Sequence, residues 1–149
     1  GFKQLGTHMS YSSIQWIGVL LCIVASFVSG FTWFGPKTFY PVWKRAMGQS
    51  PTDNPGENQN MAVTFGLTLV GTIVQAIVLA LVIDLLDRAT GHVTLLTGLG
   101  TGLIVGLGAA FMSLGHRLFA GHGLKVWLIE VGNDVLNFVI MGVILSFFY

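Results

Sequence analysis

The sequence predicts an all-α fold, a polytopic membrane four-helix bundle, and three observations lead to it. The chain has 149 residues, of which 53% are hydrophobic and 9% are charged, whereas about a quarter of the residues in a soluble domain are charged. Its mean hydropathy is +0.76. Four apolar segments reach the 20 or so residues that a helix needs to cross hydrocarbon, and they cover residues 14–34, 61–86, 93–114 and 124–148.

These spans are predicted to be helices, because every backbone polar group in lipid must find its partner within the segment. Residues 1–9 resemble the remnant of an expression tag that ends in a start methionine, so a single transmembrane domain is expected over 10–149. No signal-peptide cleavage site follows the first apolar run, which we therefore expect to remain as a membrane helix. The single cysteine, Cys22, excludes an internal disulfide, and a net charge of +1 gives no reason to expect nucleic acid as a partner.

The basic residues predict the orientation of the bundle in the membrane. Outside the first nine residues, the loop after the first span and the turn before the last span carry Lys37, Lys44, Arg45, Arg117 and Lys125. The opposite side carries only Arg88, flanked by Asp84 and Asp87. Since loops rich in Lys and Arg stay in the cytoplasm, both termini are predicted to lie outside it.

The long loop after the first span is predicted to contain a short helix. Within residues 35–48, apolar side chains recur at helical spacing with two basic residues between them, which suits a helix lying in the headgroup region. An ordinary belt of aromatic residues at the end of a span is the alternative. Residues 49–60 are rich in Pro, Asn and Gly and are expected to form a flexible loop.

Two ridges of small residues predict close helix packing and an internal repeat. A small residue recurs at every fourth position of the first and third spans, at a common offset of 80: Gly18, Cys22, Ser26 and Gly30, and then Gly98, Gly102, Gly106 and Ala110. Such ridges let helix backbones approach closely in lipid. The second and fourth spans align at an offset of 61. We therefore expect two tandem helical hairpins related by an axis along the membrane normal, the alternative being convergent use of Gly and Val.

Four polar residues lie inside the apolar last span. Glu130, Asp134 and Asn137 have i, i+4, i+7 spacing and share one helix face, with Asn133 beside them. At about 1.5 Å per residue, Asp134 lies about 13 Å from Lys125 at the basic end of the helix. A charge at that depth costs roughly 3 kcal/mol on insertion scales. These groups are therefore expected to face the bundle interior, a water-filled cavity or a partner subunit.

Polar residues elsewhere predict a pocket that opens at the same end. The second span contributes a stripe of Thr64, Thr68, Thr72 and Gln75, and the first contributes Ser26, Ser29 and Trp33 at matching depths. His116, Arg117 and His122 are expected at the mouth, with Arg117 as the countercharge of Glu130. Simpler interpretations stay open: the hydroxyls bond to their own backbone, the asparagines join helices, Asp134 holds a dimer, and the histidines are ordinary interfacial residues.

The sequence shows no motif of a soluble enzyme and no cluster of metal ligands. The stretch GLGTGLIVG at 98–106 resembles a phosphate-binding loop, but it follows no strand and lies in a span, so close packing explains it better. A metal site made of His116, His122 and Glu130 would need ligands from a turn and two helices to converge. We expect no metal and no cofactor.

Two stretches carry a family resemblance. FTWFGPKTFYPVWKRAMG at 31–48 and KVWLIEVGNDVLNFVIMGVIL at 125–145 resemble, respectively, the element after the first helix and the last helix of the domain-of-unknown-function family 1761. The resemblance implies a small four-helix protein of the bacterial inner membrane. The family supplies no activity, so it implies no catalytic residue. Glu130 matches its acidic position, whereas Asp134 is less typical of it.

Three functions are compatible with these patterns. The leading hypothesis is an oligomeric transporter or channel subunit for a small solute or ion, in which Asp134 and Glu130 bind the cargo and the small-residue ridges join copies of the chain. The alternatives are a non-catalytic scaffold or lipid-binding protein, and an enzyme acting on lipid headgroups with Glu130 or Asp134 as general base. The expected partners are membrane lipid, further copies of the chain, and a small molecule or ion.

Overall fold

The computed structural model describes residues 15–49 and 60–149, and the prediction of a tag remnant at 1–9 lies outside them. Within the described residues the fold is entirely helical, as the sequence predicts. The helices are α1 (Trp16–Trp33), α2 (Tyr40–Ala46), α3 (Met61–Thr90), α4 (Leu95–Met112), α5 (Leu114–Phe119) and α6 (Gly123–Ser146). Helix α2 is the short helix predicted within residues 35–48.

Four stretches of these helices are long and apolar enough to cross a membrane: α1, α3, α4 together with α5, and α6. They coincide with the predicted spans, but α3 continues four residues past the predicted end. It ends at Gly91, which adopts a left-handed φ of 86° that glycine tolerates best. At the other end, the Asn60 side chain accepts hydrogen bonds from two backbone amides and caps the helix.

The turn predicted between the last two spans is partly helical. Helix α4 begins with a capping box formed by Thr94 and Thr97 and gives way at Ser113 to α5. Helix α5 carries His116 and Arg117, which the sequence analysis placed in a loop. The apolar pattern ends at this point, but the backbone continues its helical course for six more residues.

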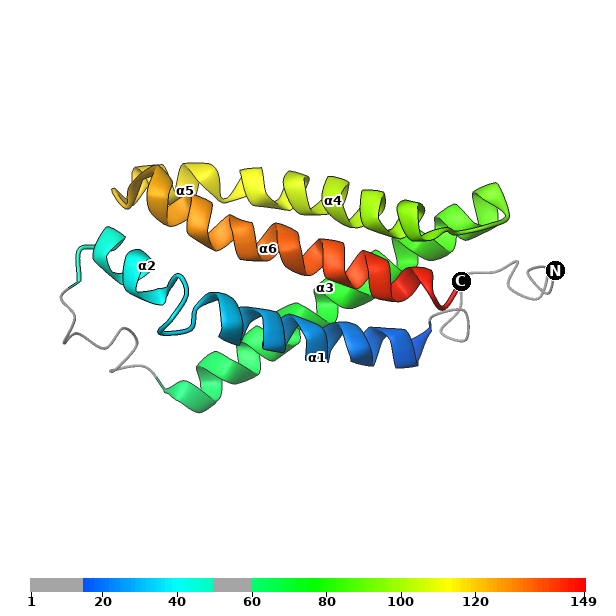
Figure 1. The fold of residues 1–149 in the computed structure, drawn as a ribbon, viewed down its shortest axis with the longest axis horizontal. Coiled ribbons are helices and arrows are strands. Elements are labelled where there is room, and N and C mark those ends of the chain that lie inside the picture. Colours follow the sequence, from blue (N-terminus) through cyan, green and yellow to red (C-terminus); the bar gives the residue numbers. More distant parts are fainter. Residues whose placement is uncertain (1–14, 50–59) are drawn as a thin grey trace.

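Helix α6 is the centre of the bundle, and it contacts every other helix. In Figure 1 it lies between α4 and α1. The α4 ridge packs on it so closely that a Cβ added at Gly98 would overlap the carbonyl oxygen of Gly142. On the other side, a Cβ at Gly18 would lie 3.2 Å from Leu145 Cδ2.

Both small-residue ridges are therefore used inside the chain. Cys22 and Ser26 of α1 are buried, as are all four members of the α4 ridge. The prediction that the ridges mediate close packing is correct. Because α6 covers most of both ridges, the further prediction that they join copies of the chain stays a prediction.

Helix α3 crosses the others obliquely (Figure 1). Its thirty residues span about 45 Å at about 1.5 Å each, more than the hydrocarbon thickness of about 30 Å, so a tilt is required. Its second half packs in the core through Ala76, Leu79, Ala80 and Ile83. Residues 61–70, in contrast, are all exposed.

The two predicted hairpins therefore differ in shape. Helices α4 and α6 pack backbone to backbone, whereas α3 diverges from α1. A Cβ at either Gly66 or Gly71 of α3 would meet nothing within 4 Å. The tandem duplication stays a prediction.

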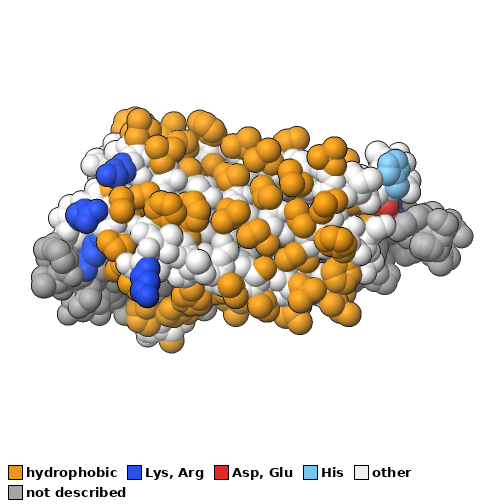
Figure 2. Space-filling model, viewed as in Figure 1, with side chains coloured by type: hydrophobic (Ala, Val, Ile, Leu, Met, Phe, Trp, Pro, Cys, Tyr) orange, Lys and Arg blue, Asp and Glu red, His pale blue; other side chains and the backbone are white. Residues whose placement is uncertain are grey.

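Charged side chains gather at the ends of the molecule. Figure 2 shows Lys and Arg at the end that holds α2 and α5, a His side chain and a small acidic area at the opposite end, and a hydrophobic band between. We call the first the basic end and the second the acidic end. Large exposed apolar side chains cover every span, for example Ile17, Leu67, Ile104 and Leu128. In lipid such a band needs no other cover.

Candidate functional site

Arg117 and Glu130 form a bidentate ion pair at the basic end. Arg117 Nε donates to Glu130 Oε1 at 2.6 Å, and Arg117 Nη2 donates to Oε2 at 2.7 Å. Trp43 Nε1 donates to Oε2 as well, at 3.0 Å. The predicted countercharge is thus in place, and the planar fork of arginine matches both carboxylate oxygens.

His122 completes this group, which we call the Arg117–Glu130 cluster: Arg117, Glu130, Trp43 and His122. Arg117 Nη1 lies 2.8 Å from His122 Nδ1. Since a guanidinium only donates, Nδ1 is the acceptor in this contact. His116 is exposed on α5. Across the described residues, no three His, Cys, Asp or Glu side chains lie close enough together to hold a metal.

The Arg117–Glu130 cluster joins three helices rather than offering a free carboxylate. It ties α2, through Trp43, and α5, through Arg117, to Glu130 of α6. Every oxygen of Glu130 already accepts a hydrogen bond from the protein, so this side chain is poorly placed to bind a cation or to act as a base.

The contact between α1 and α6 is polar along much of its length. Trp33 Nε1 donates to the Ile129 carbonyl at 2.8 Å, and Asn133 Nδ2 donates to Ser29 Oγ at 3.0 Å. Farther along, Cys22 Sγ lies 3.6 Å from the Met141 carbonyl oxygen. Asn133 therefore joins two helices, as one of the simpler interpretations held.

Two buried polar atoms of this contact have no hydrogen-bond partner within the described residues: Ser26 Oγ and Asn137 Oδ1. The Cys22–Met141 and Ser29–Asn133 contacts fix an antiparallel register, which places Ser26 and Asn137 at the same level. Asn137 is half-buried. The predicted alignment of Ser26, Ser29 and Trp33 with the polar stripe of α6 is thus present, but as a packed contact between helices.

The predicted polar face of α3 does not converge with the stripe on α6. Thr68 donates to the Thr64 carbonyl and Thr72 to the Thr68 carbonyl, so these hydroxyls bond to their own helix. Gln75 is exposed. The oblique course of α3 is the physical reason, because it carries the first half of the helix away from α6.

Asp134 is exposed on the surface of the single chain, and no ion pair or hydrogen bond joins it to any residue of the described ranges. It lies eleven residues after Gly123, about 16 Å along a helix of 24 residues that is about 36 Å long. Of the three surroundings expected for it, the interior of the single bundle is therefore wrong.

A second acidic group lies at the acidic end, and its burial was not foreseen from the sequence. Asp84 and Asp87 are 5% and 1% exposed, and Arg88 Nε donates to Asp84 Oδ2 at 3.0 Å. Burial, and next the nearby Asp84 carboxylate, raise the pKa of Tyr149 to about 12. The signal in the sequence was the i, i+3 spacing of Asp84 and Asp87, together with the i, i+4 spacing from Asp84 to Arg88.

Comparison with family models gives one result that covers most of the chain. The model described as "Protein of unknown function (DUF1761)" matches residues 17–146. Comparison with curated proteins and with solved structures finds no match. The matched range runs from the start of α1 to the end of α6 and includes every helix described above.

Proposed function

The chain belongs to the DUF1761 family, whose description gives no activity, and from the geometry we propose that it is a subunit of an oligomeric transporter or channel. In this proposal Asp134 binds a monovalent cation, a proton or an amine-bearing solute. The cargo crosses between copies of the chain, since the interior of one bundle is filled by packed helices.

The exposed and unpaired carboxylate of Asp134 carries the proposal. A charged group facing lipid near the middle of a span costs roughly 3 kcal/mol on insertion scales. Water in a pathway, or a polar surface of another subunit, would remove that cost. Glu130 has no comparable capacity, because Arg117 and Trp43 occupy both of its oxygens.

The surface that remains uncovered supports a path between copies. Since α6 covers most of both small-residue ridges, another face is the better candidate for contacts between copies. Residues 61–70 of α3 are all exposed and present Thr64 and Thr68, and exposed Gln75 follows on the same helix. In a closed ring of copies, these groups would meet the Asp134 face of a neighbour at similar depth.

The orientation that we propose follows from the distribution of charge. The basic end faces the cytoplasm of a bacterium and the acidic end faces outward, in keeping with the retention of Lys and Arg on the cytoplasmic side. Asp134 is then reached about halfway through the membrane from either side.

Flux measurements in proteoliposomes test this function. We expect the protein to carry protons, monovalent cations or methylammonium down an imposed gradient, and Asp134→Asn to reduce the rate at least tenfold while keeping size and fold. Leu128→Ala, at another exposed position of α6, is the matched control and should conduct normally. Normal flux through Asp134→Asn, or no flux of any of these cargoes through the unchanged protein, would refute the proposal.

The geometry gives less support to a lipid-headgroup enzyme. A general base needs a free carboxylate within hydrogen-bond reach of its substrate, whereas both oxygens of Glu130 are occupied. The lipid-binding alternative has a specific observation in its favour, a cavity on α2.

A further inference from the structure

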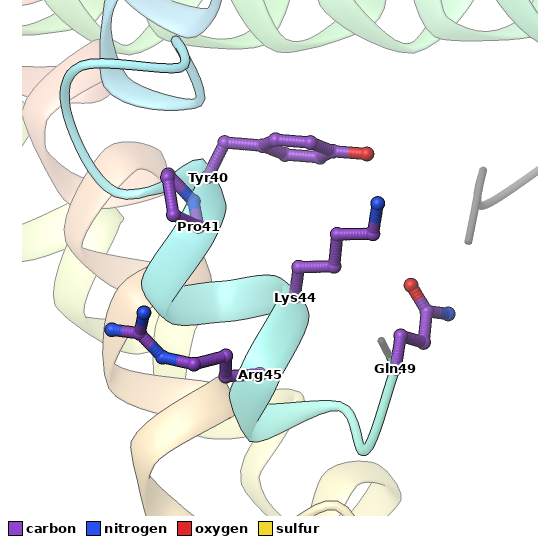
Figure 3. A pocket seen from close by; sticks show the side chains of 5 residues that line it. All are labelled: Tyr40, Pro41, Lys44, Arg45 and Gln49. Atoms are coloured by element: carbon purple, nitrogen blue, oxygen red, sulfur yellow. The ribbon is translucent and has the colours of Figure 1, made fainter. Parts of the chain in front are cut away.

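A cavity of about 290 Å³ lies beside α2 at the basic end. Tyr40, Pro41, Lys44, Arg45 and Gln49 line it. Figure 3 shows the Tyr40 hydroxyl, the Lys44 ammonium and the Gln49 amide pointing to one side of the helix, while the Arg45 guanidinium points away from them. Its volume is at the small end of the range for ligand pockets, roughly 300–1,000 Å³, so it suits a small polar group.

The chemistry of the cavity favours an anion that also carries a hydroxyl. Lys44 Nζ lies 5.9 Å from the centre of the Tyr40 ring, a cation–π contact that helps to hold the ammonium in place. Gln49 Oε1 is buried and accepts no hydrogen bond within the described residues. Because an unsatisfied buried acceptor is costly, this oxygen marks a position where a ligand donor would bind. A phosphate ester with a free hydroxyl supplies both groups.

A second cavity, of about 230 Å³, lies between α1 and α3. Phe31 of α1 and Phe65 of α3 both line it, and their ring centres are 6.4 Å apart. The residues that line it are almost all apolar: Phe27, Gly30, Phe31, Phe34, Phe65 and Thr68. Such a surface suits a hydrocarbon chain.

Three aromatic rings connect the two cavities. Phe34, which lines the apolar cavity, packs edge-on against Trp43 at 6.1 Å, and Trp43 stacks on Tyr40 of the basic cavity at 5.8 Å. The two steps together place the outer ring centres at most 11.9 Å apart.

We propose that α2 binds the headgroup of an anionic glycerophospholipid from the leaflet at the basic end, while one acyl chain of the same molecule lies in the α1/α3 cavity. Lys44 binds the phosphate as a compact charge. Gln49 Oε1 accepts a hydrogen bond from a hydroxyl of the headgroup, as phosphatidylglycerol provides. The headgroup part of the site is separate from Asp134 and does not rest on the transport proposal, whereas the acyl cavity shares Thr68 with the face proposed to meet a neighbouring copy.

The full chain in a non-ionic detergent, titrated with phosphatidylglycerol or phosphatidylcholine and observed by native mass spectrometry, tests the site. We expect phosphatidylglycerol to bind at least tenfold more tightly, and Lys44→Gln to weaken it about tenfold. The matched control is Lys37→Gln, which removes the same charge from an exposed position of the basic end that does not line the cavity. It should change the affinity less than twofold. Equal losses in the two variants, or equal affinities for the two lipids, would overturn the site.

Two further measurements separate the alternatives. Glycerol phosphate, which has the headgroup chemistry without acyl chains, should bind at least tenfold more weakly than the lipid. Equal affinity would mean a site for a free phosphate and would overturn the acyl part of the proposal. Gln49→Glu places a carboxylate in the cavity at a position outside the helices, so it tests the site even if Lys44→Gln fails to fold. Unchanged binding of phosphatidylglycerol by Gln49→Glu would contradict the proposal.

Discussion

The seam between α4 and α6 makes a sharp prediction about stability. A Cβ added at Gly102 would overlap the Phe138 carbonyl oxygen and lie 2.8 Å from the Phe138 carbonyl carbon and 2.9 Å from Val139 Cα. These neighbours are backbone atoms, which cannot rotate away. Because carbon atoms pack best at about 3.5–4.0 Å, Gly102→Ala must push the two helices apart by up to about 1 Å.

The magnitude follows from the attraction that this separation removes. A gap of 0.5–1 Å forfeits about a quarter to a half of the attraction of each facing atom pair, and overpacking typically costs about 1–3 kcal/mol. In lipid no hydrophobic gain offsets the loss. We therefore expect Gly98→Ala and Gly102→Ala each to lower the free energy of unfolding by about 2 kcal/mol.

Gly100 and Gly108 of the same helix provide the control. A Cβ at either position would meet nothing within 4 Å, so alanine there should leave stability unchanged or raise it. Thermal unfolding in detergent, followed by circular dichroism, compares the four variants. If Gly98→Ala and Gly102→Ala were as stable as Gly100→Ala and Gly108→Ala, the close approach of α4 and α6 would be wrong.

Three further predictions concern the ends of the bundle. The side chains of Arg117 and Glu130 are 30% and 22% exposed, so this ion pair is intermediate between surface and buried pairs. Surface pairs contribute about 0–1 kcal/mol, whereas breaking a buried pair costs about 3–5 kcal/mol. We expect Arg117→Ala and Glu130→Gln each to cost about 1–3 kcal/mol and the double variant to cost clearly less than their sum in a double-mutant cycle. Lys125→Ala, an exposed position nearby, should cost almost nothing, and strict additivity would argue against the pair. A cysteine at the exposed position Lys37 should react with a membrane-impermeant maleimide from the cytoplasmic side, and one at exposed His92 from the outer side. Fully buried Cys22 should give no background. Labelling of both cysteines from one side would contradict the orientation. The pKa of Tyr149 is raised to about 12, so the folded protein favours the neutral phenol. The stability that the neutral phenol contributes is fully present below the ordinary tyrosine pKa of about 10. That contribution declines as the pH rises toward 12. Phenolate absorbance should show that late titration in the unchanged protein and lack it in Tyr149→Phe, and a tyrosine titrating near pH 10 in its place would refute it.

Features that depend on a single helix could be predicted from the sequence, and so could one contact between segments close together in the chain. Continuous hydrophobicity located the four spans, and four-residue spacing found the ridges that pack on α6. The ion pair of Arg117 with Glu130 joins segments only thirteen residues apart, so the chain itself brings them close.

The surroundings of Asp134 could not be predicted in the same way. It lies about 40° around the helix from Glu130, at about 100° per residue, and that rotation takes it from a covered surface to an open one. The surface is open because α3 leans away, and the lean results from the packing of several helices at once. The indole hydrogen bonds from Trp33 and Trp43 to α6 also depend on how separate helices pack, so the sequence predicted the depth of Trp33 but not these bonds.

The central position of α6 has a consequence for how the protein is made. Helix α6 follows α1 to α5 along the chain, so the ribosome releases those helices first and they enter the lipid before the surface they pack against exists. The contact between Cys22 and Met141 joins residues 119 positions apart, and it forms only after α6 has been made. Until then, the small residues of α1 and α4 lie open to other membrane proteins, and a chain cut short before residue 123 would lack the helix that holds the rest together.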